Sequence, residues 1–196
     1  MSGIEQTAVK STPSPLAGRL RKTIVMVGMM GAGKTAVGRA LAARLGVPFL
    51  DSDAEIEAAA NMTVPEIFVR DGEPFFRRKE SQVIARLLDE ARGVLSTGGG
   101  AFLAEANRRM ISEKGVSVWL NAPVEVLWNR VRHKDSRPLL RTSNPRATLQ
   151  ELYEARKPFY READLMVLSE GDVSVEQMVD RVLAALATRP DVLEPQ

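Results

Sequence analysis

The chain has 196 residues, which is enough for one buried core and too few for two ordinary domains joined by a long linker. Hydrophobic residues make up 44% and charged residues 27%, so a disordered or fibrous chain finds little support. The 27 Lys and Arg residues nearly balance the 25 Asp and Glu residues, which argues against a nucleic-acid partner.

Cysteine is absent, which excludes disulfides, thiolate metal ligands and a cysteine nucleophile and fits a reducing compartment. The single histidine, His133, cannot build a histidine metal cluster, and its neighbours Arg132 and Lys134 predict a surface position. The first 20 residues lack the apolar core of a signal peptide, and nowhere do about 18 apolar residues follow one another. We therefore expect a cytoplasmic protein without a membrane partner.

From residue 23 onward, short apolar runs alternate with amphipathic helix patterns, which is how a parallel sheet with crossover helices appears in a sequence. The pattern predicts one three-layer α/β/α domain over residues 21–188 with a five-stranded parallel sheet. Residues 1–20 and 189–196 are expected to be tails, because the first is rich in Ser, Thr and Pro and the second is short and polar. The predicted strands are 23–27, 48–51, 93–97, 116–120 and 165–169.

The first predicted strand runs into the sequence GMMGAGKT, which matches the phosphate-binding pattern G-x-x-x-x-G-K-[ST]. The strand before it and the helix pattern after it are the context that such a loop requires. Its backbone N–H groups would bind the phosphates of a nucleotide, with Lys34 on the β and γ oxygens and the Thr35 hydroxyl on Mg²⁺.

The second predicted strand ends in LDSD, which places Asp51 and Asp53 at the carboxyl edge of the sheet, where open α/β folds bind ligands. The two carboxylates can divide the work, with Asp51 near Mg²⁺ and its waters and Asp53 on an acceptor hydroxyl that it orients or deprotonates. The alternative is that Asp53 only caps the helix that follows.

Two further helices have recognisable features. Thr63 as a cap, Pro65 in the first turn and Gly72 as a stop predict a helix over residues 63–72. In the next helix, Glu80 follows Arg77 by three residues and can hold its guanidinium toward the pocket. A guanidinium held in this way predicts a clamp for a carboxylate or phosphate.

Three consecutive glycines, 98–100, follow the third strand and would let backbone N–H groups touch a ligand, although a tight turn explains them as well. Residues 130–148 are polar, rich in arginine and broken by prolines, which predicts a long loop with a lid over about 132–146. Arg137 in this loop is a candidate arginine finger for the γ-phosphate, and Arg156 is a candidate second anion clamp.

Six motifs, GMMGAGKT, DSD, FRRKE, TGGG, SRPLL and EARKPFY, occur in an order and at spacings that resemble those of shikimate kinases. The likeness spans about residues 23 to 186. It implies a P-loop kinase fold of the nucleoside-monophosphate-kinase type with a lid. It also implies ATP-dependent phosphorylation of the 3-hydroxyl of shikimate, giving shikimate 3-phosphate and ADP in aromatic amino-acid biosynthesis. The implied partner is this small molecule, and we expect a monomer.

Together, the motifs and the resemblance assign roles to individual residues. The residues expected in catalysis are Lys34, Asp53 and Arg137. Those expected at ATP are Gly31, Ala32, Gly33, Lys34, Thr35, Ala36, Arg130 and Arg137, of which Arg130 is similar to the family's adenine-contacting arginine. Those expected at shikimate are Asp53, Arg77, Gly98, Gly99, Gly100 and Arg156, and those expected at Mg²⁺ are Thr35 and Asp51.

Other functions are weighed against this interpretation. A kinase of another small polyol, such as gluconate, would meet a similar acceptor with a carboxylate and hydroxyls, but the FRRKE and SRPLL motifs favour shikimate. A GTPase lacks its guanine-reading N-K-x-D motif, and a nucleic-acid-binding module would need a large basic face. Residues 169–174 lack the basic residue that some shikimate kinases place near the adenine.

Overall fold

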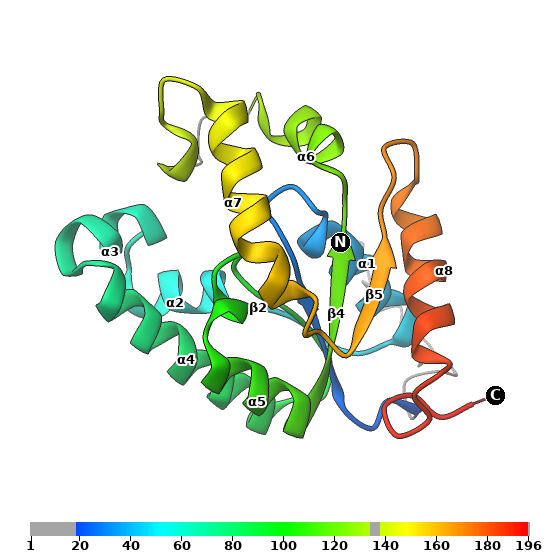
Figure 1. Cartoon of the computed structure of the whole chain (residues 1–196). Helices are drawn as coiled ribbons and strands as arrows, with labels where there is room; N and C mark the ends of the chain where they lie inside the picture. Colours follow the sequence, from blue (N-terminus) through cyan, green and yellow to red (C-terminus); the bar gives the residue numbers. More distant parts are fainter. Residues whose placement is uncertain (1–18, 134–137, 196) are drawn as a thin grey trace, which may run out of the picture.

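A computed structural model describes residues 19–133 and 138–195. Its centre is a five-stranded parallel sheet in the order β2-β3-β1-β4-β5, with helices on both faces (Figure 1). The strands are β1 (Thr23–Val27), β2 (Phe49–Asp51), β3 (Val94–Ser96), β4 (Gly115–Asn121) and β5 (Leu165–Leu168). The expected three-layer α/β fold is therefore confirmed, and every strand begins and ends within one residue of its predicted limits.

The central strands β1 and β4 are mostly apolar because helices cover both faces of a parallel sheet. All five residues of β1 are buried, as are the first six of β4. Helices α1 and α8 pack together on one face, and α4 packs beside α5 on the other. The helices that surround the sheet are α1 (Lys34–Leu45), α2 (Ser52–Ala60), α3 (Val64–Asp71), α4 (Glu73–Glu90), α5 (Glu105–Lys114), α6 (Val124–Val131), α7 (Pro145–Tyr160) and α8 (Val175–Leu186).

Helices α2, α3 and the start of α4 project from one side of the sheet, on the left in Figure 1, and have a small apolar core of their own. Ile56, Ile67 and Phe76 are buried there, apart from the main core. Helix α3 begins with a capping box at Thr63 and ends at Gly72, as its local signals predict. This projecting unit carries part of the site described below.

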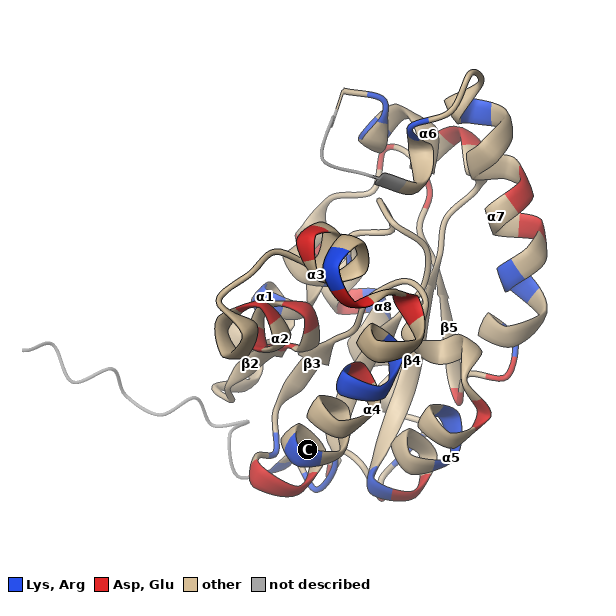
Figure 2. Cartoon of the chain, turned by 90° about the vertical axis from the view of Figure 1, so that its left-hand side faces the viewer, with Lys and Arg blue, Asp and Glu red and all other residues tan. Residues whose placement is uncertain are grey.

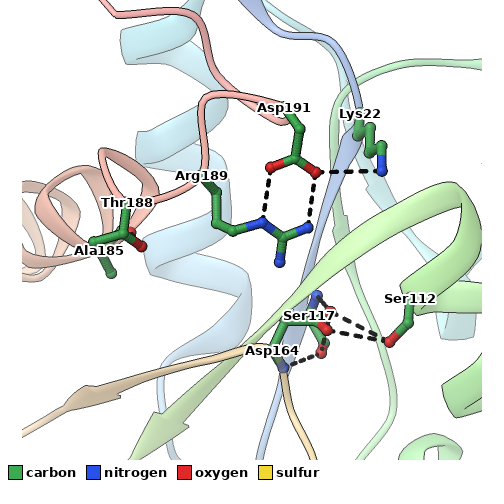
Figure 3. Close-up of polar contacts among 8 residues, drawn as sticks. All are labelled: Lys22, Ser112, Ser117, Asp164, Ala185, Thr188, Arg189 and Asp191. Atoms are coloured by element: carbon green, nitrogen blue, oxygen red, sulfur yellow. Dashed lines mark hydrogen bonds and ion pairs between the residues drawn. The ribbon is translucent and has the colours of Figure 1, made fainter.

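The C-terminal segment packs against the base of the sheet, which differs from the expected tail over 189–196. Val192 is fully buried and Leu193 is 9% exposed. Asp191 accepts two hydrogen bonds of 2.8 Å from Arg189 and lies 3.4 Å from Lys22 Nζ (Figure 3). The two apolar side chains explain the packing, since they are covered only when the segment folds back.

Residues 1–18, most of the expected N-terminal tail, lie outside the described residues, and so does Arg137. The loop expected over 130–148 is shorter than predicted, because α6 continues to Val131 and α7 already begins at Pro145. Between these helices lies a short 3₁₀ helix, η3 (Pro138–Leu140). His133 is exposed, as predicted.

Charged residues of both signs alternate along α3, α4, α5 and α7 on the face shown in Figure 2. Such a face has no single-sign field to attract a polyanion. Within the described ranges, no helix is both long enough and apolar enough to cross a membrane.

Candidate active site

The carboxyl ends of three neighbouring strands bring the sequence motifs together. The strand order sets β2, β3 and β1 side by side, so the segments that follow them share one edge of the sheet. These segments are the aspartates after β2, the glycines after β3 and the phosphate loop after β1. Motifs that are up to about 70 residues apart in sequence therefore line one site.

The phosphate loop ends at the first turn of α1. Gly31 and Gly33 have φ angles of 81° and 93°, a left-handed region in which residues with a side chain are strained. Gly33 offers no side-chain cap to α1, and the first turn of the helix holds no acidic residue. The first N–H groups of a helix point away from its body and carry the positive end of its dipole, so this helix end suits an anion. Lys34 Nζ donates hydrogen bonds to the carbonyls of Gly28 (2.8 Å) and Met29 (2.9 Å) at the mouth of the loop.

Arg130 joins the phosphate loop to the segment after β5. Its Nη1 donates to the carbonyl of Gly31 at 3.0 Å, and its Nη2 donates to the hydroxyl of buried Ser169 at 3.3 Å. Burial lowers the pKa of this guanidinium. The structure thus brings Arg130 to the nucleotide side of the site, away from the acceptor residues.

Thr35 and Asp51 offer oxygen atoms at the end of the phosphate loop. Thr35 is exposed in the first turn of α1, and Asp51 is the last residue of β2. Asp51 also caps α2, since its Oδ1 accepts a hydrogen bond from the Ala54 N–H at 3.1 Å. The alternative role of Asp53 as this cap is therefore wrong, because the helix starts one residue before Asp53 rather than after it.

These donors fit Mg²⁺, which prefers oxygen ligands and is commonly held by one or two carboxylates, water and substrate phosphates. Asp51 retains Oδ2 for the ion or its waters, and Thr35 retains its hydroxyl. In the described part of the chain, no group of three or more His, Cys, Asp or Glu side chains could hold a metal. Such a site would therefore depend on the phosphates of a bound nucleotide.

Asp53 lies in the first turn of α2 and turns its carboxylate toward the glycine segment. A Cβ atom placed on Gly98 would lie 3.0 Å from Asp53 Oδ1, which is buried and has no hydrogen-bond partner. Burial raises the pKa of Asp53 to about 6, the charge of Asp51 adds to this effect, and Lys34 opposes it. This carboxylate is thus still mostly ionised at pH 7 and available to a hydroxyl donor.

Arg77 on α4 is held by two carboxylates. Its Nη1 donates to Glu80 Oε1 at 2.9 Å, and its Nη2 donates to Glu73 Oε1 at 3.2 Å. The Phe76 ring also lies 5.3 Å from the guanidinium carbon. The predicted pairing of Arg77 with Glu80 is confirmed. The pairing with Glu73 was missed, although its i−4 spacing on the same helix is a usable signal.

Glu80 is buried and has spare hydrogen-bonding capacity. Its side chain is 1% exposed, and its second oxygen, Oε2, has no hydrogen-bond partner. Burial raises the pKa of Glu80 to about 7, Arg77 opposes this rise, and the nearby charge of Asp53 adds to it. Only one oxygen of the Glu80 carboxylate therefore accepts a hydrogen bond from Arg77, and the other remains available.

Arg156 reaches the same glycine segment from α7. It is 7% exposed, and its Nη1 lies 3.0 Å from the position of a Cβ atom on Gly99. Tyr160 donates a 2.5 Å hydrogen bond from its hydroxyl to the Gly99 carbonyl, and burial raises the pKa of this phenol. Tyr160 was missed from sequence, although it lies one helical turn after Arg156 and so shares its face.

One side of the site has a phosphate-binding loop and a helix N-terminus, and the other side has an aspartate and two arginines. This arrangement defines a P-loop kinase for a small anionic acceptor. The comparisons with known proteins agree. A model of the family described as shikimate kinase matches residues 30–187. The chain belongs to the shikimate kinase family and has its activity, the phosphorylation of shikimate, with ATP as the family's phosphoryl donor.

Individual relatives cover nearly all of the chain. The shikimate kinase of Ruegeria pomeroyi is 75% identical over 99% of both chains, and that of Rhizobium meliloti is 53% identical over 85% of this chain and 86% of its own. A solved structure of Acinetobacter baumannii shikimate kinase in complex with shikimate superposes with a TM-score of 0.80 at 38% identity, covering 85% of this chain and 93% of that one. A Sinorhizobium meliloti gluconokinase shares the fold, with a TM-score of 0.56 at 22% identity over 87% of this chain and 94% of its own.

Proposed function

We propose that the chain transfers the γ-phosphoryl group of ATP to the 3-hydroxyl of shikimate, with Asp53 on the reacting hydroxyl and Arg77 and Arg156 on the ring carboxylate. The observation that carries this proposal is the arrangement along the glycine segment. The Asp53 carboxylate faces Gly98, and the two guanidinium groups face the two glycines that follow. An acceptor with a carboxylate at one end and a hydroxyl at the other suits such a row of charges.

The nucleotide would lie along the phosphate loop. The N–H groups of residues 31–36 would bind the phosphates, Lys34 would neutralise the β and γ oxygens, and Arg130 would contact the adenine. Arg137, in the segment outside the described residues, would meet the γ-phosphate from the lid over about 132–146. The helix N-terminus and the lysine support this orientation, because both favour the negative charge of a triphosphate.

Thr35 and Asp51 would hold Mg²⁺ together with the phosphates. The ion would supply neutralisation of the negative charge on the phosphate oxygens. The chain's own residues fix the acceptor, and Asp53 orients the 3-hydroxyl and accepts its proton. The hydroxyl oxygen bonds to the γ-phosphorus while the bond from that phosphorus to the ADP oxygen breaks, and ADP leaves. Positioning supplies much of the rate, since the reacting atoms are held in line and water is excluded.

The direct test is release of ADP with shikimate, gluconate or a nucleoside monophosphate as acceptor. We expect turnover with shikimate and at least about a hundredfold lower kcat/KM with the other two. Gluconate is an open chain that does not hold its carboxylate and hydroxyls at the fixed spacing of a ring, and a nucleoside monophosphate has no carboxylate. Arg77→Ala should raise the KM for shikimate by about tenfold or more while the KM for ATP stays unchanged. Arg78→Ala is the matched control, because Arg78 is exposed on the same helix. Equal effects of the two substitutions would contradict the role of Arg77.

The expected monomeric state and cytoplasmic location stay proposals. Light scattering on purified enzyme tests the first, and a mass near 21.5 kDa is the expected value. A mass near twice that value would contradict the monomer. Fractionation of producing cells tests the location.

A further inference from the structure

Gly98, Gly99 and Gly100 are not required by their backbone conformation. None of the three has a positive φ, and Gly100 has φ −93° and ψ −8°, which other residues adopt. This distinguishes them from the glycines of the phosphate loop. The reason for glycine at these positions must therefore lie in the space that a side chain would fill.

A Cβ atom on each glycine would meet a different functional side chain. On Gly98 it would lie 3.0 and 3.1 Å from the two oxygens of Asp53, and on Gly99 it would lie 3.0 Å from Arg156 Nη1. On Gly100 it would lie 2.6 Å from Arg77 Nη1 and 2.7 Å from Arg77 Cζ. Three consecutive residues thus leave room for three separate charged groups.

Other glycines with ordinary backbone angles have a different reason for lacking a side chain. A Cβ atom on Gly93 would collide with the carbonyl of Pro48, and one on Gly115 would lie 2.6 Å from the carbonyl of Thr23. These glycines let neighbouring backbones approach within the sheet. At positions 98–100 the nearest atoms are the charged ends of side chains.

Glu80 adds an independent observation at the first of the three positions. Its Oε2, on a side chain that is 1% exposed, has no hydrogen-bond partner and lies 3.3 Å from the Cβ position on Gly98. Asp53 Oδ1 is also buried without a partner and lies 3.0 Å from the same point. Two unpaired oxygens facing one space indicate that a polar ligand group, and not an apolar side chain, belongs there.

We propose that Gly98, Gly99 and Gly100 are three separate positioning residues, which seat Asp53, Arg156 and Arg77 respectively by leaving out one methyl group each. This inference rests on the acceptor-binding roles in the proposed function. It adds a second role to these glycines, besides the contacts that their backbone N–H groups would make with the acceptor. Arg77 cannot simply swing away from a side chain at residue 100, because Glu73 and Glu80 hold its guanidinium. Glu80 is buried and cannot follow the guanidinium far, so a displacement would distort its hydrogen bond to Arg77.

The three alanine substitutions should have different kinetic signatures. Gly100→Ala should raise the KM for shikimate by about tenfold or more, because it displaces a carboxylate-binding arginine. Gly99→Ala should do the same through Arg156, to a smaller extent, since its contact is longer. Gly98→Ala should mainly lower kcat, because it displaces the group on the reacting hydroxyl. The KM for ATP should stay within about twofold in all three.

Double-substitution cycles test whether Gly100 acts through Arg77 and Gly99 acts through Arg156. We expect Gly100→Ala to have almost no further effect on kcat/KM in an Arg77→Ala background and its full effect in an Arg156→Ala background. Gly99→Ala should show the reverse pattern. Equal, additive effects in both backgrounds would overturn the proposal. Wild-type enzyme without turnover on shikimate would instead refute the proposed function, so the two failures are distinguishable.

A stability measurement keeps the test valid if a single variant folds poorly. The melting temperature of ligand-free Gly100→Ala should lie below that of the wild type, whereas the Gly100→Ala/Arg77→Ala double variant should melt at the same temperature as Arg77→Ala alone, because the collision needs the arginine. Recovery of a folded protein only in the double variant would also support the proposal. A double variant that melts as far below Arg77→Ala as Gly100→Ala melts below the wild type would overturn it.

Discussion

At the residue scale, Asp53 and Glu80 are two buried carboxylates with different surroundings. Glu80 accepts a hydrogen bond from Arg77 with one oxygen, whereas the buried Oδ1 of Asp53 has no hydrogen-bond partner and the carboxylate feels the charge of Lys34. Because their partners differ, the two carboxylates suit different roles. Glu80 fixes the position of another side chain, and Asp53 is left free to meet the acceptor.

Replacing Asp53 with Asn should lower kcat by about 10² to 10⁴-fold, because the amide keeps the shape but accepts no proton. Binding of MgATP, measured by calorimetry, should stay within about threefold of the wild type. Glu55→Gln on the same helix is the control, because Glu55 pairs with Arg86, and it should keep normal turnover. A kcat of Asp53→Asn near the wild-type value would refute the role of Asp53.

Glu80 should make folding stability depend on pH. Its pKa is about 7 in the folded chain against an ordinary value of 4.5, so the folded state binds the proton more tightly. The contribution is fully present below about pH 4.5 and is lost as the pH rises through 7. In urea unfolding between pH 5 and 7, the unfolding free energy of the wild type should fall with pH, with a slope of up to that given by about one proton. Glu80→Gln should remove this slope. An unchanged pH slope in the variant would contradict this origin.

The residue pairs that sequence could predict are those close together on one helix. The Arg77–Glu80 pair follows from i+3 spacing alone. By contrast, Tyr160 meets Gly99 across 61 positions, and no local pattern encodes that contact. Sequence considered a cap of α2 only as the alternative role of Asp53 and did not predict Asp51 as the cap. Strand and helix meet without a loop, so one residue ends β2 and caps α2.

At the element scale, the N-terminal end of α1 carries the residues that we propose for the nucleotide. Lys34→Met should lower kcat/KM for ATP by at least about a hundredfold, since it removes the ammonium from the β and γ oxygens. Arg39→Met is a control from the same helix, because Arg39 is exposed and lies over the Phe49 ring. Turnover of Lys34→Met within about threefold of the wild type would refute the assignment.

Helix ends were predictable where capping chemistry is local. Thr63 and Gly72 bound α3 because a hydroxyl cap and a glycine stop act on neighbouring backbone groups. The predicted loop over residues 130–148 is too long, because a polar sequence does not by itself distinguish a loop from an exposed helix end. Helix α7 begins there at Pro145, a proline in the first turn whose missing N–H is not needed, with Asn144 as its cap.

At the scale of the whole molecule, the C-terminal segment stabilises the base of the sheet. Val192→Ala should lower the unfolding free energy by about 1 to 3 kcal/mol, since it removes buried methyl groups. Val69→Ala is the matched control, because Val69 is 90% exposed, and it should change stability by less than about 0.5 kcal/mol. The KM for shikimate should stay unchanged in both. Equal melting temperatures for the two variants would show that residues 189–195 do not support the fold.

The fold class was predictable because alternating apolar strands and amphipathic helices are a pattern of the whole chain. The packing of the C-terminal segment was not, since it depends on partners as distant as Lys22 and Leu20. Figure 3 also shows Asp164 accepting hydrogen bonds from Ser117, another long-range contact near the same end of the sheet. Such contacts become visible only once the topology is known.

The most direct test of the central claim is a crystal structure of the enzyme with shikimate and ADP. The account predicts the ring carboxylate within hydrogen-bond distance of Arg77 and Arg156, and the 3-hydroxyl on Asp53 with its oxygen facing the phosphate loop. Shikimate bound in the opposite orientation, or outside the glycine segment of residues 98–100, would contradict it.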